Sequence, residues 1–524
     1  MNESNNLKNE PLQTQLKSLV EELPEIYQPI YGLENVFKTY SRTTIDRLAS
    51  IRTITRALKK KYSRPLRILD LGCAQGYISF SLAEEGHSIL AIDHLDKNIN
   101  LCNKLKDIYP DYDIHFECSD IEISVEAINT ADYDLVICLS VLHHIVHDHG
   151  LAVTLQLIEK LACNVCAAIF EFALHSEPLY WAKSQPKSER DLLDSYLFIH
   201  CASQHDTHLS EIKRPLYYAS NHYWFADGYC GDILKYSNKS HKLSEITNDR
   251  KYYFSKDTII KIFAKTPQNI GQASDNLIDE ANFLKSAPID LNAPQLISFG
   301  SNQYETWIIR KFINGSLLLD IFHNLNNDEI HQVLVNITEQ LMLLEKHKLY
   351  HNDLRLWNVI VSENFCTTLI DYGAIKSINS DCQWPSNVFL SYFIFVYELT
   401  SRKVDTYMIS RPPFISPFNL PTPYNLILSR IWDLPCNLWS FEYIHNILIN
   451  SKELPDAANQ LSPTTLWIKS IENYLNAERN FLERNNFHLN NLTRKVNTVL
   501  NPVRKIRNSK FVQFLHDIYI HYFK

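Results

Sequence analysis

Hydrophobic and polar positions between residues 65 and 175 follow two alternating patterns. Short apolar runs typical of strands are followed repeatedly by amphipathic stretches with helical spacing. The pattern predicts strands at 67–71, 88–93, 114–118, 134–139 and 165–173, and helices at 77–86, 96–108 and 151–162. Strands that alternate with helices in this way favour an α/β domain, in which a parallel sheet is covered by helices on both faces.

The segments on either side of this alternation look different. Residues 1–60 have a helical pattern that ends in a run of lysines, and the α/β domain is expected to occupy 61–235. Within it, residues 174–230 are rich in aromatic side chains and histidine, which predicts a cap or substrate-binding insertion, and 222–229 resembles part of a strand hairpin. The polar stretch 235–251 is the best candidate for a domain boundary.

A second order of elements follows the boundary. Strand patterns at 252–263 and 295–313 enclose a helical pattern at 275–286, and the rest of the chain is mainly helical. This order predicts an α+β domain over 240–460. Its strongest apolar run, 388–397, is far shorter than a bilayer span and is interpreted as a buried helix.

The C-terminal region has a seven-residue repeat of apolar positions. The first seam consists of Ile468, Leu475, Leu482, Leu489 and Val496, and Ile471, Leu492 and Val499 lie three residues further on. The repeat predicts a short coiled coil over 465–501, and a helix packed on its own domain is the alternative. The basic segment 503–524 has apolar side chains at helical spacing, which is typical either of a helix lying on an anionic membrane surface or of a solvated end packed on a partner.

Length and composition narrow the class of protein. With 524 residues the chain is too long for one core, and 45% apolar and 21% charged residues are typical of a soluble globular protein. The net charge of −8 gives no reason to expect nucleic acid as a partner, and the polar start is not a secretory signal. The cysteines are scattered, and Cys163 and Cys166 form one isolated CxxC, so we expect reduced thiols in the cytosol and no zinc site.

A tight glycine turn follows the first predicted strand, in the sequence DLGCAQG. Gly72 and Gly76 remove side chains where a ligand must approach the backbone, and Asp70 before the turn suits a cationic amino group better than a phosphate. Asp93 ends the second predicted strand, where a carboxylate can accept both ribose hydroxyls. Asp120 follows the third strand, at a position suited to the exocyclic amine of adenine. The set differs from the dinucleotide fingerprint, whose glycines cradle a pyrophosphate.

This set resembles the class I S-adenosylmethionine-dependent methyltransferases, which have a Rossmann-like fold, over about residues 65–175. A nucleotide fold that has lost its ligand is the alternative. In such enzymes the segment SVLHHIVHDHG, which begins at Ser140, flanks the transferred methyl group. His143, His144 or His147 is therefore expected to act as a base or to hold an anionic acceptor, with at least one structural histidine and a metal site as other interpretations.

A second set of chemical groups lies in the α+β domain. Asp353 follows an amphipathic helix, Asn358 comes five residues later, and Asp371 stands before a glycine after a short apolar strand. An acid that orients an attacking hydroxyl, followed by an amide and a second carboxylate that hold Mg²⁺ against the phosphates of ATP, fits phosphoryl transfer. HNDLRLWN and DYG resemble the catalytic loop and the DFG motif of protein kinases.

The same resemblance covers three further positions. Arg355 replaces the lysine of the catalytic loop and is expected to steady the phosphoryl group. Lys261 is expected to bind the phosphates, with Glu280 as its helix partner. No glycine-rich loop precedes Lys261, which argues against a standard protein kinase more than against ATP, and a pseudokinase is the alternative.

The order of these parts resembles the bacterial bifunctional enzymes that terminate polymannose O-antigen chains. ELPEIYQPIYG at 22–32, the histidine-rich run and HNDLRLWN carry the likeness, which covers nearly the whole chain. It implies that a kinase phosphorylates the terminal sugar of a lipid-linked polysaccharide and that a methyltransferase methylates this phosphate, using S-adenosylmethionine, ATP and Mg²⁺. It also implies oligomerisation through the coiled coil, a peripheral position on the cytoplasmic face of the inner membrane, and a polymerising mannosyltransferase as partner.

Two alternative functions fit the same motifs. One is a small-molecule or sugar kinase fused to an independent small-molecule methyltransferase, and the other is a non-catalytic scaffold that binds nucleotides. The N-terminal segment is a candidate to close over the methyl donor, through Tyr27, Gln28 and Tyr31 and more weakly through Arg42.

Overall fold

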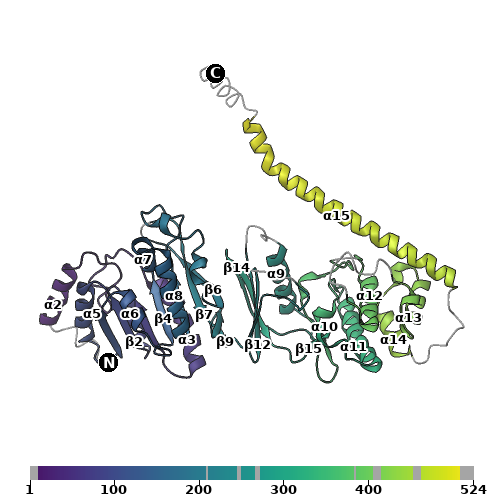
Figure 1. Ribbon diagram of the computed structural model, residues 1–524, viewed down its shortest axis with the longest axis horizontal. Coiled ribbons are helices and arrows are strands. Elements are labelled where there is room, and N and C mark those ends of the chain that lie inside the picture. The colour runs from purple at the N-terminus through teal and green to yellow at the C-terminus, as the bar shows by residue number, and fades with distance from the viewer. Residues whose placement is uncertain are drawn as a thin grey trace, which may run out of the picture. The chain divides into compact units, whose positions relative to one another are not determined.

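The computed structural model describes residues 10–207, 210–244, 249–265, 272–382, 385–404, 415–451 and 462–507. By contacts between residues the chain divides into two compact units. The first unit comprises 1–239, 247–268 and 297–312, and the second comprises 240–246, 269–296 and 313–524. Figure 1 shows the helices and strands of both units.

The first unit is organised around a seven-stranded sheet with the order β3-β2-β1-β4-β5-β7-β6. Its strands are β1 (Arg67–Leu71), β2 (Ser88–Asp93), β3 (Ile114–Cys118), β4 (Leu135–Leu139), β5 (Ala167–Glu171), β6 (Phe198–His205) and β7 (Arg214–Ser220). Strands β1 to β5 are parallel, as predicted, whereas β7 pairs antiparallel with both β5 and β6. Since β6 and β7 extend the sheet, most of 198–220 is not the separate cap that the sequence predicted.

Helices cover both faces of this sheet (Figure 1). They are α2 (Glu10–Glu21), α3 (Ile45–Tyr62), α4 (Tyr77–Glu84), α5 (Asp96–Lys106), α6 (Ile121–Ala127), α7 (Leu142–Asp148) and α8 (Leu151–Asn164). Successive residues of the inner strands alternate between two cores: Ile137 packs with α3, α4 and α5, and Cys138 packs with α6, α7 and α8. Of the helical segment predicted over 1–60, the residues between α2 and α3 form turns and irregular chain instead.

A five-stranded antiparallel sheet, in the order β10-β11-β12-β14-β13, belongs mainly to the first unit as well. Its strands are β10 (Lys235–Ser237), β11 (Arg250–Phe254), β12 (Thr258–Ala264), β13 (Leu296–Ser301) and β14 (Glu305–Lys311), and the hairpin β8 (Tyr223–Ala226) and β9 (Tyr229–Asp232) precedes it. The buried carboxylate of Glu305 binds His200 Nδ1 at 2.7 Å and Arg190 Nη2 at 3.1 Å. The sheet is thereby tied to the methyltransferase-like core, although the sequence assigned 240–460 to one separate domain.

The second unit is mainly helical. Its helices are α9 (Gln272–Lys285), α10 (Leu318–Ile321), α11 (Asn327–Lys346), α12 (Val388–Ser401), α13 (Tyr424–Asp433), α14 (Phe441–Ile449) and α15 (Pro463–Arg507), and its short strands are β15 (Ser316–Leu317), β16 (Tyr350–His351), β17 (Val359–Val361), β18 (Thr367–Leu369) and β19 (Ile375–Lys376). Helix α12 is almost entirely buried, as its apolar sequence predicted. No helix in the described part of the chain has the length and apolar character needed to span a bilayer.

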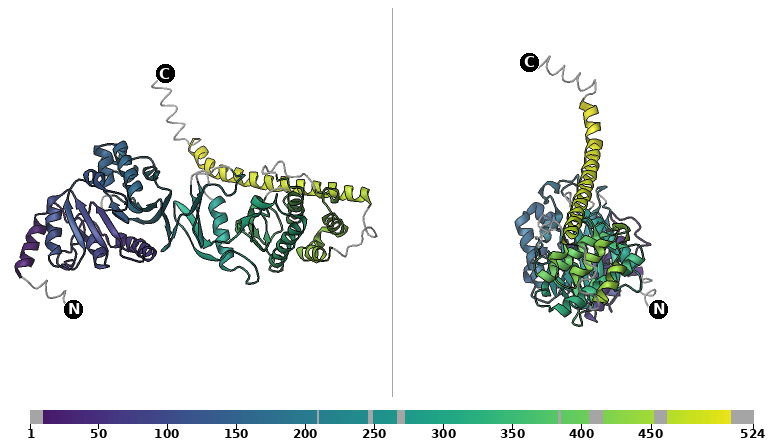
Figure 2. Two further views of the ribbon diagram at one scale, coloured as in Figure 1. Left: turned by 60° about the horizontal axis from the view of Figure 1, so that its bottom comes forward. Right: turned by 90° about the vertical axis from the view of Figure 1, so that its right-hand side faces the viewer.

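Helix α15 is one uninterrupted helix, drawn in yellow in Figure 2. Its inner face includes Leu466 and Ala477, which are buried. The predicted heptad positions face solvent: Ile468, Ile471, Leu475, Leu482, Leu489 and Leu492 are each about half exposed, between 48% and 59%. The side chains of Val496 and Val499 and the basic segment 508–524 lie outside the described residues.

Candidate active sites

The glycine turn borders a cavity of about 340 Å³ at the carboxyl ends of the parallel strands. Its wall includes residues that directly follow β1 and β4, the last residue of β2 and the first residue of α6 after β3. The N-terminal segment and the region after β5 contribute further side chains. The lining residues are Glu25, Tyr27, Arg42, Gly72, Ala74, Asp93, His94, Ile121, Leu139, Ser140, Val141, His143, His144, Trp181, Thr207 and Arg214. Ligands of open α/β sheets bind at this end, beside the strands where the order reverses.

The geometry of the turn explains its two glycines. Gly72 has φ +80°, and a Cβ at this position would lie 2.3 Å from Val141 Cγ2. Gly76 has φ +75°, and its Cβ would lie 3.0 Å from Cys102 Sγ and 3.1 Å from Phe116. Side chains are therefore excluded at both positions by conformation and by packing. Of the two, only Gly72 lines the cavity.

Asp93 lines the cavity at the end of β2 and shapes its floor. Its Oδ2 accepts a hydrogen bond of 2.9 Å from the backbone N–H of Ala74, and its Oδ1 accepts one of 2.9 Å from Leu95 N. Asn98 Nδ2 donates to the same Oδ1 at 3.1 Å. The carboxylate is thus held rigidly beside the glycine turn, which suits the predicted contact with ribose hydroxyls.

The two other predicted acids do not line this cavity. Asp70 is buried and accepts a hydrogen bond of 2.5 Å from Ser79 Oγ, and burial raises its pKa to about 6, assisted by repulsion from Asp93. Asp120 is exposed and stands at the start of α6, next to the lining residue Ile121. Direct contact of Asp70 and Asp120 with the cofactor stays a prediction.

The N-terminal segment closes one side of the cavity. Tyr27 lines it and accepts a hydrogen bond of 2.7 Å from Arg42 Nη1. Gln28 holds the glycine turn instead of facing the cavity: its Nε2 donates to the Cys73 carbonyl at 2.8 Å, and Gln75 Oε1 accepts from its backbone N–H at 3.2 Å. We therefore assign Gln28 a positioning role. Tyr31 lines a different cavity.

Buried arginines form the most strongly charged part of the cavity wall. Arg42 and Arg47 bind opposite oxygens of the Glu171 carboxylate, and Ser140 Oγ also donates to it. Arg214 pairs with Glu177 through two hydrogen bonds of 2.7 and 2.6 Å.

Both lining arginines also donate to Ser140 Oγ, Arg42 at 2.8 Å and Arg214 at 3.2 Å. Burial would raise the pKa of Glu171, but the two guanidiniums bring it below its usual value. The network remains ionised and presents two guanidiniums to the cavity.

Burial disfavours the protonated form of His143 and His144. Burial lowers the pKa of His143 to about 2, assisted by His144, Arg214 and Arg42, and burial also lowers the pKa of His144. The His143 ring lies 4.1 Å from the His144 ring and 4.8 Å from Trp181, and its buried Nδ1 has no hydrogen-bond partner among the described residues. The arginines provide the fixed positive charge of this wall, and a role of the histidines as a base or as a contact to an anionic acceptor stays a prediction.

No group of three or more metal-ligating side chains is present in the described residues, so the metal interpretation of the histidine run finds no support there. His147 contacts Ser184, and His149 forms an ion pair with Glu122.

The sequence reasoning missed Arg214 and Trp181 and ranked Arg42 lowest. None of the three lies in a recognisable motif, and the fold gathers them from β7, from the chain after β5 and from the N-terminal segment.

In the second unit, the predicted catalytic loop has a compact geometry. Asn358 Nδ2 donates to both the backbone carbonyl and Oδ2 of Asp353, each at 2.9 Å. The other carboxylate oxygen, Oδ1, is buried and has no hydrogen-bond partner among the described residues. Burial raises the pKa of Asp353, and repulsion from Asp381 and Asp371 adds to this effect while Arg355 opposes it. An unsatisfied acceptor with a raised pKa suits a group that orients an attacking hydroxyl.

Arg355 does not have the geometry of a phosphoryl-binding cation. Its side chain is 1% exposed and forms two hydrogen bonds of 2.9 and 2.7 Å with the buried carboxylate of Asp381. Its Nε lies 3.6 Å from Asp353 Oδ1. The guanidinium is committed to Asp381 and braces the loop, so its observed place differs from the contact with the transferred group that the sequence predicted.

Asp371 is fixed beside the loop. It has the left-handed conformation φ 65°, ψ 64°, which non-glycine residues adopt mainly where the surroundings impose it. The preceding Ile370 donates from its N–H to the Asn358 carbonyl at 2.9 Å. The next residue, Tyr372, stacks on Phe283 of α9 at 4.4 Å, and the missing Cβ of Gly373 lets Asn276 approach. Asn358 and Asp371 are the residues that would hold Mg²⁺, since both carry oxygen ligands of the kind it prefers.

The remaining predicted residues are distributed over both units. Lys261 is 4% exposed on β12 of the first unit, and Glu280 is fully buried on α9 of the second, so their pairing stays a prediction. The segment 238–249, which joins β10 and β11 along the chain, contains no glycine. In it His241 stacks on Trp357 of the catalytic loop, with ring centroids 4.3 Å apart.

Comparisons with known proteins identify the two kinds of domain. Residues 68–162 match the methyltransferase domain family, and residues 241–388 match the protein tyrosine and serine/threonine kinase family. The chain therefore combines a methyltransferase domain with a kinase domain, classes that use S-adenosylmethionine and ATP.

The similarity extends over most of the chain. Two Escherichia coli proteins named O-antigen chain terminator bifunctional methyltransferase/kinase WbdD are 34% identical over 469 residues, which is 88% of this chain and 66% of each relative. A crystal structure of WbdD has a TM-score of 0.68 and 33% identity, covering 87% of this chain and 99% of that chain. A low-resolution WbdD structure with an ordered C-terminal bundle has a TM-score of 0.74 and 32% identity, covering 93% of this chain and 100% of that chain.

The chain belongs to the family of these bifunctional methyltransferase/kinases. It spans slightly less than two thirds of the length of the curated relatives that it matches.

Proposed function

We propose that the protein phosphorylates the terminal sugar of a lipid-linked O-antigen polysaccharide and then methylates that phosphate, which ends chain extension. The observation that carries this proposal is the pair of buried guanidiniums, Arg42 and Arg214, in the wall of the cofactor cavity. A methyltransferase for a neutral hydroxyl needs a base at this place. Guanidiniums beside neutral histidines suit an acceptor that already carries negative charge, such as a phosphate monoester.

For methyl transfer, the chain's residues have to place the acceptor rather than activate it. Arg42 and Arg214 would bind two phosphate oxygens and leave the third directed at the methyl donor, and neutral His143 would donate or accept one hydrogen bond. Bound S-adenosylmethionine supplies the electrophilic methyl group. One phosphate oxygen forms the new O–CH₃ bond as the S–CH₃ bond breaks.

For phosphoryl transfer, Asp353 would orient the sugar hydroxyl through Oδ1, which accepts no hydrogen bond from the described residues, and would take its proton. Asn358 and Asp371 would hold Mg²⁺, and Lys261 would bind the phosphates of ATP, which supplies the phosphoryl group. Arg355 acts through Asp353 and Asp381 by holding the loop in shape. The retention of all these groups favours an active kinase over a pseudokinase.

The order of the two reactions is tested by incubating the protein with a synthetic oligomannose, ATP and S-adenosylmethionine, each donor labelled in turn. We expect methyl label on the glycan only when ATP is present. Asp353→Ala should abolish both labels, and Asp93→Ala only the methyl label. Methyl label that survives in Asp353→Ala would overturn the order and point to direct methylation of the sugar. Transfer to free monosaccharides alone would favour the fused small-molecule enzyme.

The exposed seam of α15 supports self-association. Apolar side chains such as Leu475 and Leu482 stand about half exposed at heptad spacing, and covering them requires another helix. We propose a homo-oligomeric coiled coil, in keeping with the C-terminal bundle of the relative. Leu482→Glu should give monomers in light scattering, while Arg479→Glu at a polar position should leave the oligomer intact. Unchanged mass for Leu482→Glu would exclude the coil.

We also propose that the basic segment 503–524 binds the membrane surface and that a polymerising mannosyltransferase is a partner of the protein. Five lysines and arginines among apolar side chains favour binding to the anionic cytoplasmic face of the inner membrane. Co-sedimentation with vesicles containing anionic lipid should be lost when residues 503–524 are deleted. Equal binding of the truncated protein would refute the membrane role of this segment.

A further inference from the structure

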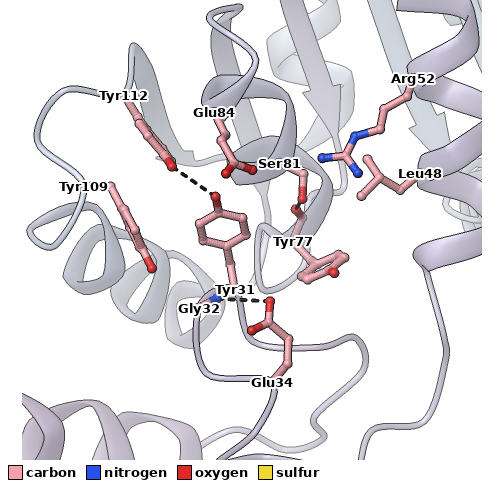
Figure 3. A pocket seen from close by; sticks show the side chains of 10 residues that line it. All are labelled: Tyr31, Gly32, Glu34, Leu48, Arg52, Tyr77, Ser81, Glu84, Tyr109 and Tyr112. Carbon is pink, nitrogen blue, oxygen red and sulfur yellow. Dashed lines mark hydrogen bonds between the residues drawn. The ribbon is translucent and has the colours of Figure 1, made fainter. Parts of the chain in front are cut away.

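A second cavity, of about 390 Å³, lies beside helix α4 of the first unit (Figure 3). The irregular chain between α2 and α3 contributes Tyr31, Gly32 and Glu34 to its wall, and α4 contributes Tyr77 and Glu84. The cavity shares no lining residue with the cofactor cavity. The segment 25–42 borders both, with Tyr27 and Arg42 on one cavity and Tyr31 on the other.

The walls of this cavity are aromatic and rigid. Tyr31 is stacked on Phe80 at 5.3 Å, and Tyr77 and Tyr109 stand edge-on to it at 6.3 and 5.2 Å. Tyr109 is in turn stacked on Tyr112 at 5.1 Å. Tyr31 is 9% exposed, whereas the other three tyrosines are only partly buried, so part of their surface borders the cavity.

Polar groups of both kinds stand among these rings. Glu34 and Glu84 offer carboxylate oxygens, and the Gly32 N–H donates to Glu34 Oε1 at 3.2 Å, which orients that side chain (Figure 3). Arg52 brings a guanidinium, held by Glu85 at 2.5 Å. Tyr31 and Tyr112 join their hydroxyl groups at 3.1 Å. The cavity is therefore built before any ligand arrives.

We propose that this cavity binds a neutral pyranose unit of the acceptor polysaccharide, at a distance from the end that is modified. A pyranose has one face of C–H groups that packs on an aromatic ring and a rim of hydroxyls that need both acceptors and donors. Tyrosine faces, two carboxylates and one guanidinium supply these groups together.

Other ligand classes fit less well. Glu34 and Glu84 would repel a phosphate or nucleotide, and Arg52 would repel a quaternary ammonium group from the same tyrosines. The inference rests on the proposed function for the identity of the polysaccharide, and the binding test below does not depend on methyl transfer.

The test combines ligand-observed NMR with kinetics on the full-length protein. Saturation transfer should reach α-linked mannotetraose at millimolar concentration, and Tyr77→Ala and Glu84→Gln should each weaken the signal several fold, since the kinase site still binds the terminal sugar. Because Glu84 is exposed, Glu84→Gln should fold normally, so the test remains valid even if Tyr77→Ala fails to fold. Tyr229→Ala, at an exposed tyrosine that lines neither cavity, should leave the signal unchanged.

In methylation assays with a phosphorylated tetrasaccharide, Tyr77→Ala and Glu84→Gln should raise KM about tenfold, a typical cost of removing one well-placed contact, with kcat unchanged. The constants for a phosphorylated monosaccharide should not move, because it is too short to reach this cavity. No tetraose signal in the unmodified protein, or a signal of undiminished strength in both variants, overturns the inference. Oligosaccharide binding without methylation of any phosphorylated sugar would refute the proposed function and leave the sugar site standing.

Discussion

The cofactor cavity and the catalytic loop of the kinase differ in how their buried charged groups are paired. In the cofactor cavity the ionised groups are paired within one unit: Glu171 is held by two arginines, and Glu177 forms a two-bond pair with Arg214. In the kinase loop the paired group is the supporting one, Arg355 with Asp381, whereas Asp353 keeps an oxygen without a hydrogen-bond partner among the described residues.

The difference follows from what each site has to do. A site that positions an existing anion benefits from cations fixed during folding, since no proton has to move. A site that takes a proton from a hydroxyl needs an acceptor that is free of other hydrogen bonds. The hydrogen-bond network around this acceptor offsets the free-energy cost of burying it. The residues predicted to bind ATP and Mg²⁺ belong to two units, Lys261 to the first and Asn358 and Asp371 to the second.

The strongest test of this comparison is to break the brace of the kinase loop. Arg355→Ala removes the guanidinium that pairs with the buried carboxylate of Asp381 and should destabilise the second unit by about 3–5 kcal/mol. Arg355→Met combined with Asp381→Leu should recover much of this loss, because both members of the buried ion pair are replaced by apolar side chains. Denaturant melts of the variants measure the stability.

Phosphoryl transfer in the double variant then decides between the two roles of Arg355. Recovered activity supports a bracing role, and a stable but inactive double variant would show that Arg355 touches the transferred group.

The next test removes one fixed cation from the methyl-transfer site. Arg214→Gln combined with Glu177→Gln replaces an ion pair by an amide pair of similar size. We expect kcat/KM for methylation of a phosphorylated sugar to fall about 100-fold, as typical for the loss of a charge-assisted bidentate contact, while phosphoryl transfer stays unchanged. Arg67→Gln, at an exposed arginine on β1, is the matched control. Unchanged methylation in the double variant would remove Arg214 from the acceptor site.

A third test concerns the sheet that carries Lys261. Arg190 and His200 overcome the effect of burial and lower the pKa of Glu305 to about 2, from a usual value of 4.5. The folded state therefore favours the carboxylate, so this stabilisation is complete above about pH 4.5 and is lost as pH falls towards 2.

The lowered pKa of Glu305 corresponds to about 3 kcal/mol in the free energy of unfolding. Glu305→Gln should lower the free energy of unfolding of the first unit at pH 7 and flatten its dependence on pH between about 5 and 2, as measured by denaturant melts at each pH. A pH dependence identical to that of the unmodified protein would show that other carboxylates govern the acid limb.

The smallest effect is expected at His143. The pKa of His143, lowered to about 2, keeps the ring neutral between pH 5 and 8. The ring therefore adds no rising or falling limb to the pH dependence of the methylation rate in this range. The acceptor phosphate has a second pKa near 6, and the rate should rise as pH passes about 6 and the dianion forms. His143→Gln should keep this limb and change the rate by only a few fold. A limb that disappears in this variant would assign the titration to the histidine.

Much of the architecture was accessible from local patterns. The parallel strands β1 to β5, the helix α12 and the exposed heptad positions of α15 were all predicted within a few residues, because strand and helix periodicity depends on neighbours in the chain. The glycine turn with Gly72 and the catalytic loop with Asp353 and Asn358 were recognisable for the same reason, since each is a short motif on one connection.

Other features came from contacts between distant residues. Arg214 reaches the cofactor cavity only because β7 joins the sheet antiparallel to β5, and Arg355 turns to Asp381, 26 residues away. The five-stranded sheet belongs with the methyltransferase core because Glu305 finds Arg190 and His200 there. The sequence by itself determined which elements form and which motifs carry chemistry, because these depend on spacing along the chain. Only the tertiary structure decided which charges are paired, which stay neutral and which face a cavity, because these depend on burial and on partners that no local pattern specifies.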